Sequence, residues 1–175
     1  MKLRSVLLLS ISLVFSAVSV SAQETINWVT FEKAVELAQK EPRPVIMDVY
    51  TDWCGWCKKM DAQTFANPKI AAYVNQYFYA VKFNAEQKEP ITFKDSLFEF
   101  IPNGQRGYHE LAAVLMQGKL SYPTIVYLDK ELNLIQPIPG FQTPQALEPI
   151  INFFGSDKYR SMSWEDFSSQ FKSNL

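Results

Sequence analysis

Short apolar runs separated by polar segments follow one another along most of this chain. Residues 44–50 and 78–83 are almost continuously apolar, and each is bounded by prolines, a turn or a helix cap. Such runs are typical of strands that are buried on both faces of a sheet. Residues 122–128 and 132–138 predict two further strands, joined as a hairpin through a short polar turn.

Helices are predicted where apolar residues recur at helical spacing behind a capping residue. Thr30 and Thr143 are suited to begin such helices, whereas Gly118 and Gly155 are suited to end them. The predicted helices cover residues 30–39, 58–65, 67–77, 108–117 and 143–154.

Two segments fit this pattern less simply. Residues 84–108 mix polar and apolar positions, and their periodicity does not distinguish a hairpin from a loop. The sequence Ser163-Trp164-Glu165-Asp166 resembles a capping box and predicts a last helix with an aromatic stripe. That stripe either packs back on the domain or forms an exposed surface for a partner.

The N-terminal residues have the pattern of a secretory signal peptide. Lys2 and Arg4 precede an apolar run over residues 6–20, and small residues follow at the end of residues 1–22. The apolar run is shorter than the roughly 20 residues that span a membrane, so we favour cleavage over an uncleaved anchor. We expect a single exported domain at residues 23–175, periplasmic if the source has an outer membrane.

Composition and charge limit the classes of function. The chain is 47% hydrophobic and 14% aromatic, which is enough for one domain with a substantial core. Its formal net charge is −1, its basic residues are scattered, and its aromatic residues lie among apolar ones. We therefore expect no nucleic-acid partner.

The candidate chemistry lies in the segment TDWCGWCKKM, which holds the chain's two cysteines, Cys54 and Cys57. A bridge between them closes a very short loop and would stabilise the fold little. Because a strand precedes them and a helix follows, Cys54 lies at a helix start, where backbone N–H groups favour a thiolate. Cys54 is then the nucleophile and Cys57 the resolving thiol, while Trp53 and Trp56 form an apolar rim. Such a pair exchanges electrons without a bound cofactor.

These residues occur in a longer pattern that resembles thioredoxin. Residues 45–58 resemble its active-site segment, and Asp48, six residues before Cys54, occupies the position of the family's buried aspartate. Lys82 on the next apolar strand matches the lysine paired with that aspartate. Pro123 matches the family's cis-proline, and Gly140 matches its late glycine. The resemblance covers roughly residues 44–154.

The resemblance implies an α/β thioredoxin-like fold, with a central mixed β-sheet flanked by helices. Residues 84–108 would be an insertion before the cis-proline strand, and the last helix would be an addition. Burial would raise the pKa of Asp48, allowing it to accept a proton from Cys57, and Lys82 would offset the buried charge. An ordinary structural salt bridge is the alternative for that pair. The substrate-binding residues would be Trp53, Gly55, Trp56, Tyr122, Pro123 and Gly140.

The implied function is that of an exported thiol-disulfide oxidoreductase. We expect it to reduce or repair disulfides in periplasmic proteins as a monomer, without a cofactor and with electrons from a membrane donor. Trp56 stands where thioredoxin itself carries proline, so the direction of electron flow does not follow from the resemblance. An oxidase that forms disulfides remains an alternative.

Two non-redox functions are alternatives. A structural zinc site needs four ligands, whereas this chain has two cysteines and one histidine, His109, which we expect to be solvated or capping. Covalent haem attachment needs histidine directly after Cys57, where Lys58 stands. A peptide-binding module would use the groove beside Pro123 and would not need the thiols.

Overall fold

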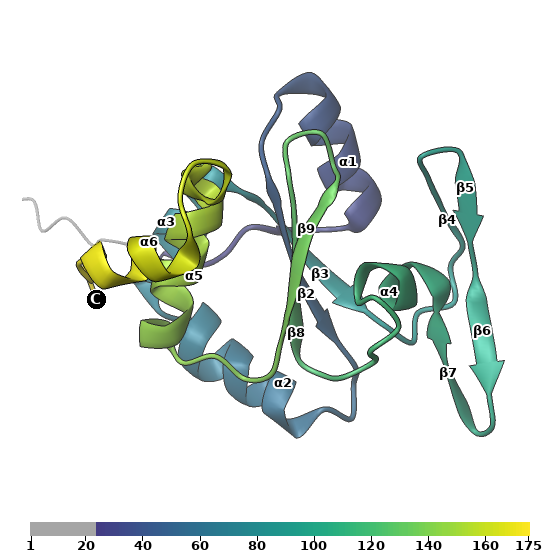
Figure 1. The fold of residues 1–175 in the computed structure, drawn as a ribbon. Coiled ribbons are helices and arrows are strands. Elements are labelled where there is room, and N and C mark those ends of the chain that lie inside the picture. The colour runs from purple at the N-terminus through teal and green to yellow at the C-terminus, as the bar shows by residue number, and fades with distance from the viewer. Residues whose placement is uncertain (1–23) are drawn as a thin grey trace, which may run out of the picture.

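A computed structural model describes residues 24–175, which are built around a five-stranded mixed sheet (Figure 1). The strand order is β1-β3-β2-β8-β9. The first three strands in that order are parallel, β8 runs antiparallel to β2, and β9 runs antiparallel to β8. Their bounds are β1 (Trp28–Val29), β2 (Val45–Tyr50), β3 (Tyr79–Asn84), β8 (Thr124–Leu128) and β9 (Leu134–Pro139).

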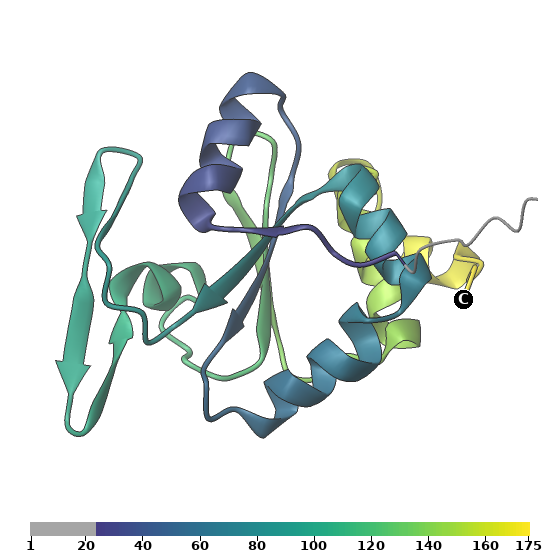
Figure 2. The ribbon, with the colours of Figure 1, turned by 180° about the vertical axis from the view of Figure 1, so that it is seen from behind.

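Helices cover both faces of the sheet, as the view from behind also shows (Figure 2). Helices α1 (Phe31–Lys40) and α4 (Glu110–Leu115) pack with one apolar cluster. The helices of the other cluster are α2 (Gly55–Met60), the π-helix η1 (Asp61–Phe65), α3 (Pro68–Tyr77) and α5 (Pro144–Gly155). After a 3-10 turn, η2 (Lys158–Arg160), helix α6 (Trp164–Gln170) packs Phe167 against that second cluster. This arrangement confirms the predicted α/β fold.

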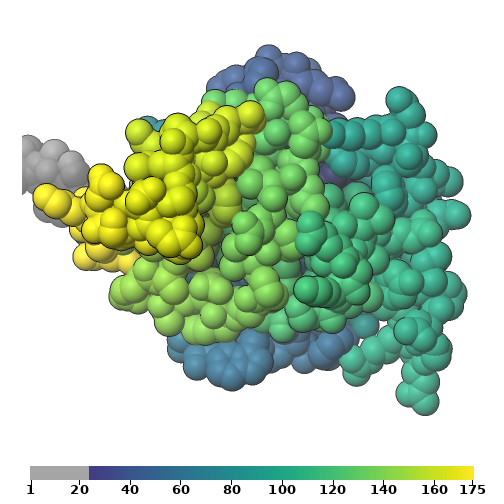
Figure 3. Space-filling view, viewed as in Figure 1, coloured from purple at the N-terminus to yellow at the C-terminus, as the bar shows by residue number. Residues whose placement is uncertain are grey.

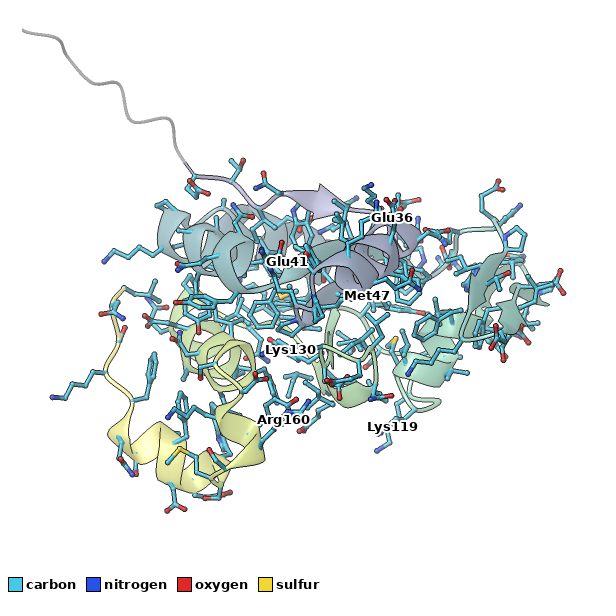
Figure 4. The ribbon with its side chains drawn as sticks, turned by 90° about the horizontal axis from the view of Figure 1, so that it is seen from above. Glu36, Glu41, Met47, Lys119, Lys130 and Arg160 are labelled. Carbon is cyan, nitrogen blue, oxygen red and sulfur yellow. A yellow bond between two sulfur atoms is a disulfide. The ribbon has the colours of Figure 1, made fainter. Side chains whose placement is uncertain are left out.

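Strand β2 is buried on both faces, which explains its continuous apolar sequence. Met47 and Val49 belong to the cluster of α1 and α4, whereas Ile46 belongs to the cluster of α2, α3 and α5. Figure 4 shows Met47 in the interior, while Lys119 extends outward. Since strand side chains alternate between faces, Asp48 lies on the side of Ile46, toward α2.

Within the segment 84–108, whose periodicity did not distinguish a hairpin from a loop, two antiparallel hairpins begin at Ile91. The first pairs β4 (Ile91–Phe93) with β5 (Ser96–Phe98), and the second pairs β6 (Phe100–Asn103) with β7 (Arg106–His109). We call the β6–β7 hairpin the arm. Figure 1 shows it projecting beside the sheet, in teal, and in Figure 3 the teal atoms of the insertion form one edge of the molecule.

Several predicted boundaries were wrong. The helix expected from residue 108 begins at Glu110, because Tyr108 and His109 pair with β6. Strand β9 begins at Leu134 because Leu132 lies in the turn, with a φ of 61°. Helix α5 includes Gly155, which was expected to end it. Strand β1 was missed because two residues carry no periodicity.

The predicted signal peptide, residues 1–22, lies outside the described residues. Within residues 24–175, the helices are too short or too polar to cross a membrane. The predicted helix over residues 58–65 is present, as the end of α2 followed by η1.

Candidate redox site

Cys54 and Cys57 form a disulfide at the start of α2. Cys54 is the N-cap residue, and the backbone N–H of Cys57 donates to Cys54 Sγ over 3.0 Å. Such a donor stabilises negative charge on a sulfur once the bridge is reduced. Both cysteines are buried, at 4% exposure for Cys54 and 2% for Cys57.

Lys82 on β3 joins two carboxylates, one on the strand before the disulfide and one on the helical segment after it. Asp48 on β2 is its neighbour in the parallel register, and Lys82 Nζ donates to Asp48 Oδ2 over 2.6 Å. Lys82 also pairs with Asp61, the first residue of η1. The rings of Trp28, Tyr50 and Phe65 lie 5.0–5.6 Å from the ammonium. The group is therefore a charged triad with an aromatic surround, rather than the simple pair that the resemblance implies.

The environment of Asp48 alters its acidity. Burial raises the pKa of Asp48 from 3.8 to about 6, even though the attraction of Lys82 works in the opposite direction. Burial alone would lower the pKa of Lys82, but Asp48 and Asp61 raise it on balance above its usual value. Asp48 Oδ1 is buried and has no hydrogen-bond partner among residues 24–175. One oxygen of Asp48 is thus held by Lys82, and the other is free to accept a proton.

A shallow pocket lies beside the disulfide, next to the start of β8. The Tyr122–Pro123 peptide is cis, as the resemblance implies. The backbone N–H of Gly140 donates to the carbonyl oxygen of Pro123 over 2.8 Å, so the two segments are joined. The pocket is lined by Trp56, Tyr122, Pro123, Gly140 and Phe141. Four of the six predicted substrate-binding residues therefore line one pocket.

The two tryptophans are exposed, at 51% for Trp53 and 57% for Trp56. The ring of Trp56 lies 5.5 Å from Phe141, and Lys59 Nζ lies 4.7 Å from its centroid. Trp53 packs edge-on against Tyr122, with centroids 5.9 Å apart. Both rings therefore belong to an exposed apolar rim, as predicted, and neither is part of the core.

Sequence reasoning missed Asp61, Phe141, Glu86 and Arg106. The sequence pointed to Asp61, because it follows Cys57 by four residues and so lies on the same helical face. It pointed less clearly to Phe141, which directly follows the late glycine, Gly140. Glu86 and Arg106 meet Trp53 only after the insertion folds back, so sequence spacing gave no signal for them.

The metal-site alternative gains no support within residues 24–175. That part of the chain holds no group of three or more His, Cys, Asp or Glu side chains arranged for a metal ion. His109 is fully buried rather than solvated, and its Nδ1 accepts from the Leu111 N–H and caps α4. Its Nε2 lies 3.1 Å from the Glu89 carbonyl oxygen.

Comparison with protein families gives one match that covers most of the chain. The family model Thioredox_DsbH, described as a protein of unknown function, DUF255, matches residues 16–138. The solved structure of a DsbH oxidoreductase superposes with a TM-score of 0.55 over 84% of this chain and 95% of that one, at 16% identity. A putative disulphide-isomerase from Bacteroides thetaiotaomicron gives 0.54 over 82% and 100%, at 19% identity. At these identities the structures establish the thioredoxin fold.

Curated relatives match shorter segments. The thiol:disulfide interchange protein DsbD of Vibrio vulnificus is 37% identical over 46 residues, covering 26% of this chain and 8% of that protein. Human spermatogenesis-associated protein 20 is 27% identical over 71 residues, covering 40% and 9%. The chain thus covers less than a tenth of the length of either relative.

Proposed function

Because the chain belongs to the Thioredox_DsbH family of thioredoxin-like proteins, we propose that it is a thiol-disulfide oxidoreductase that reduces or repairs disulfides in other proteins. The observation that carries the proposal is the Cys54–Cys57 disulfide at the start of α2, with the buried Asp48 on the preceding strand β2 and an apolar pocket beside it. A purely structural bridge across so short a loop would need none of these surroundings.

The reaction begins with the reduced protein. The Cys54 thiolate attacks one sulfur of a substrate disulfide, which forms a mixed disulfide and releases one substrate thiolate. Cys57 then loses its proton and attacks Cys54 Sγ. The second substrate thiolate leaves, and the Cys54–Cys57 disulfide is formed. Two electrons have passed to the substrate, so a donor must reduce the protein again.

In this proposal Asp48 accepts the proton of Cys57. A base works best when its pKa lies near the working pH, and burial brings the pKa of Asp48 to about 6. Lys82 holds Asp48 Oδ2, which leaves Oδ1 to take the proton. Lys82 and Asp61 are therefore positioning residues for Asp48.

The pocket and its rim would hold the substrate. Trp53, Trp56 and Tyr122 offer apolar contacts, the space around Gly55 is open, and an extended peptide beside Pro123 would pass Gly140. The proposal extends to export into the periplasm, a monomeric state, reaction without a bound cofactor and a membrane electron donor.

Trapping experiments test the proposed function. In the Cys57→Ser variant, the mixed disulfide between Cys54 and a substrate protein is expected to accumulate, because the resolving thiol is missing. In Cys54→Ser no such adduct is expected through residue 54, and turnover of a disulfide-bonded protein is expected to be lost. Mass spectrometry of alkylated samples measures both. Full turnover by Cys54→Ser would contradict the proposal. A wild type without turnover, together with unchanged substrate affinity in Cys54→Ser, would favour peptide binding.

A further inference from the structure

The arm reaches the rim of the disulfide. Arg106, the first residue of β7, holds its guanidinium carbon 4.3 Å from the ring centroid of Trp53. In both ribbon views, the turn of the arm lies at the same end of the molecule as the start of α2 (Figures 1 and 2). The insertion therefore contributes a side chain to the surface that a substrate disulfide meets.

Trp53 is held from three directions although half of its surface is exposed. Arg106 stacks on the ring, Tyr122 packs edge-on against it, and the indole N–H donates to Glu86 Oε1 over 3.0 Å. An aromatic ring that is fixed and yet exposed loses little conformational entropy when a partner binds. Trp53 is thus a preformed contact surface next to Cys54.

Arg106 keeps hydrogen-bonding capacity. Its side chain is exposed and forms no ion pair or hydrogen bond within residues 24–175. Two carboxylates close to Trp53 already have hydrogen-bond partners. Glu86 accepts from the Trp53 indole N–H, and Asp52, the residue before Trp53, accepts from Asn84. A guanidinium that stacks on an aromatic face leaves its N–H edge open, and that edge matches a carboxylate.

We infer that Arg106 binds a carboxylate of the substrate polypeptide close to its disulfide, while Trp53 packs against the adjacent apolar part. The inference rests on the proposed function and names its substrate class. The occupant is an extended chain with Asp or Glu near the reacting cysteine. Because Arg106 contacts the ring of Trp53, the residue before Cys54, and not the cysteine, the carboxylate belongs to a neighbouring residue of the substrate and not to its cysteine.

A pair of disulfide peptides that differ at one residue tests this inference. The peptides carry Glu or Gln beside the cysteine, and the reduced protein is mixed with each while tryptophan fluorescence follows the reaction. We expect the wild type to reduce the Glu peptide about three to five times faster, as for one exposed ion pair, with less preference at high salt. Arg106→Gln is expected to reduce both peptides equally fast.

Lys94→Gln is the matched control. Lys94 lies in the other hairpin of the insertion, stacks on Phe93 and donates to Asn133 Oδ1, away from Trp53. This variant should keep the preference for Glu. Equal rates with both peptides in the wild type, or a full preference in Arg106→Gln, would overturn the inference.

A small aromatic disulfide separates the two proposals. Wild type and Arg106→Gln should reduce it at the same rate, because it carries no neighbouring carboxylate. If the wild type reduces neither this compound nor either peptide, the proposed function itself fails. If it reduces the small compound and both peptides alike, only the assignment of Arg106 is lost.

Discussion

Asp48 and Lys82 are paired residues on β2 and β3, and their placement explains why a carboxylate lies inside an apolar strand. Its charge is expensive to bury, and Lys82 compensates only part of that cost. A side chain kept for packing alone would be apolar here. We therefore expect substitution of Asp48 to affect both the rate of catalysis and the stability of the fold.

For catalysis, Asp48→Asn should slow the release of a mixed disulfide by Cys57 on the order of a hundredfold. Alkylation of Cys54 should be largely unaffected, because Asp48 acts on the second step. In the wild type, the release rate should rise with pH through about 6 as Asp48 loses its proton, and the variant should lack that rise. Acid-quenched samples analysed by mass give both rates.

Asp52→Asn is the control for that experiment. Asp52 is also close to Cys54 in sequence, but it is exposed and accepts from Asn84. Its substitution should leave the release rate and its pH dependence unchanged. Equal release rates for wild type and Asp48→Asn would remove Asp48 from the mechanism.

For stability, Asp48→Asn should stabilise the oxidised protein at neutral pH. The folded-state pKa of Asp48 is raised from 3.8 to about 6, so its ionisation destabilises the fold progressively between these two values. Well above pH 6 the cost is about 3 kcal/mol, and near pH 4 it falls below about 1 kcal/mol. Denaturant unfolding of both proteins at pH 4 and pH 7.5 measures it. The same difference in free energy of unfolding between the two proteins at both pH values would show that the ionisation of Asp48 is not the cause.

At the scale of elements, the C-terminal residues are tied to α5 by one buried carboxylate. Glu148 is 5% exposed, accepts from the Asn174 N–H over 2.7 Å and also accepts from the Ser173 hydroxyl. Leu175 packs against the same apolar cluster as α5. Glu148 thus fixes the segment that follows α6.

Glu148→Ala should lower the free energy of unfolding by about 1–3 kcal/mol, because two hydrogen bonds to a buried charge are lost. Glu165→Ala, which removes an exposed carboxylate from α6, should change it by less than about 0.5 kcal/mol. Thermal unfolding of both variants gives the comparison. Equal stability of the wild type and Glu148→Ala would show that the hydrogen bonds of Glu148 to Ser173 and Asn174 do not stabilise the fold.

Elements with a strong local signal were predictable from sequence. The buried strands β2 and β3 have continuous apolar runs, and the caps Thr30 and Thr143 accept the expected backbone N–H groups. The arm was not predictable, because its short strands are partly exposed and have no clear period. Pairing with β6 there placed the first two residues of a predicted helix, Tyr108 and His109, in β7.

At the scale of the whole molecule, the order of motifs predicted which residues would meet. Asp48 and Lys82 meet because β2 and β3 are adjacent, and the Cys54–Cys57 disulfide lies at the start of α2, which follows β2. The contacts of Lys82 with Asp61, and of Trp53 with Arg106, depend on how helices and hairpins pack. Sequence spacing therefore located the disulfide but not the full surface around it.

The direction of electron flow is a property of the whole molecule, since every group around the disulfide affects its reduction potential. We would measure that potential for Cys54–Cys57 by alkylating the protein in graded dithiol buffers and counting blocked thiols by mass. The account predicts a value near the roughly −270 mV of thioredoxin, as a reductase requires. A value near about −120 mV, that of a strong oxidant, would contradict it.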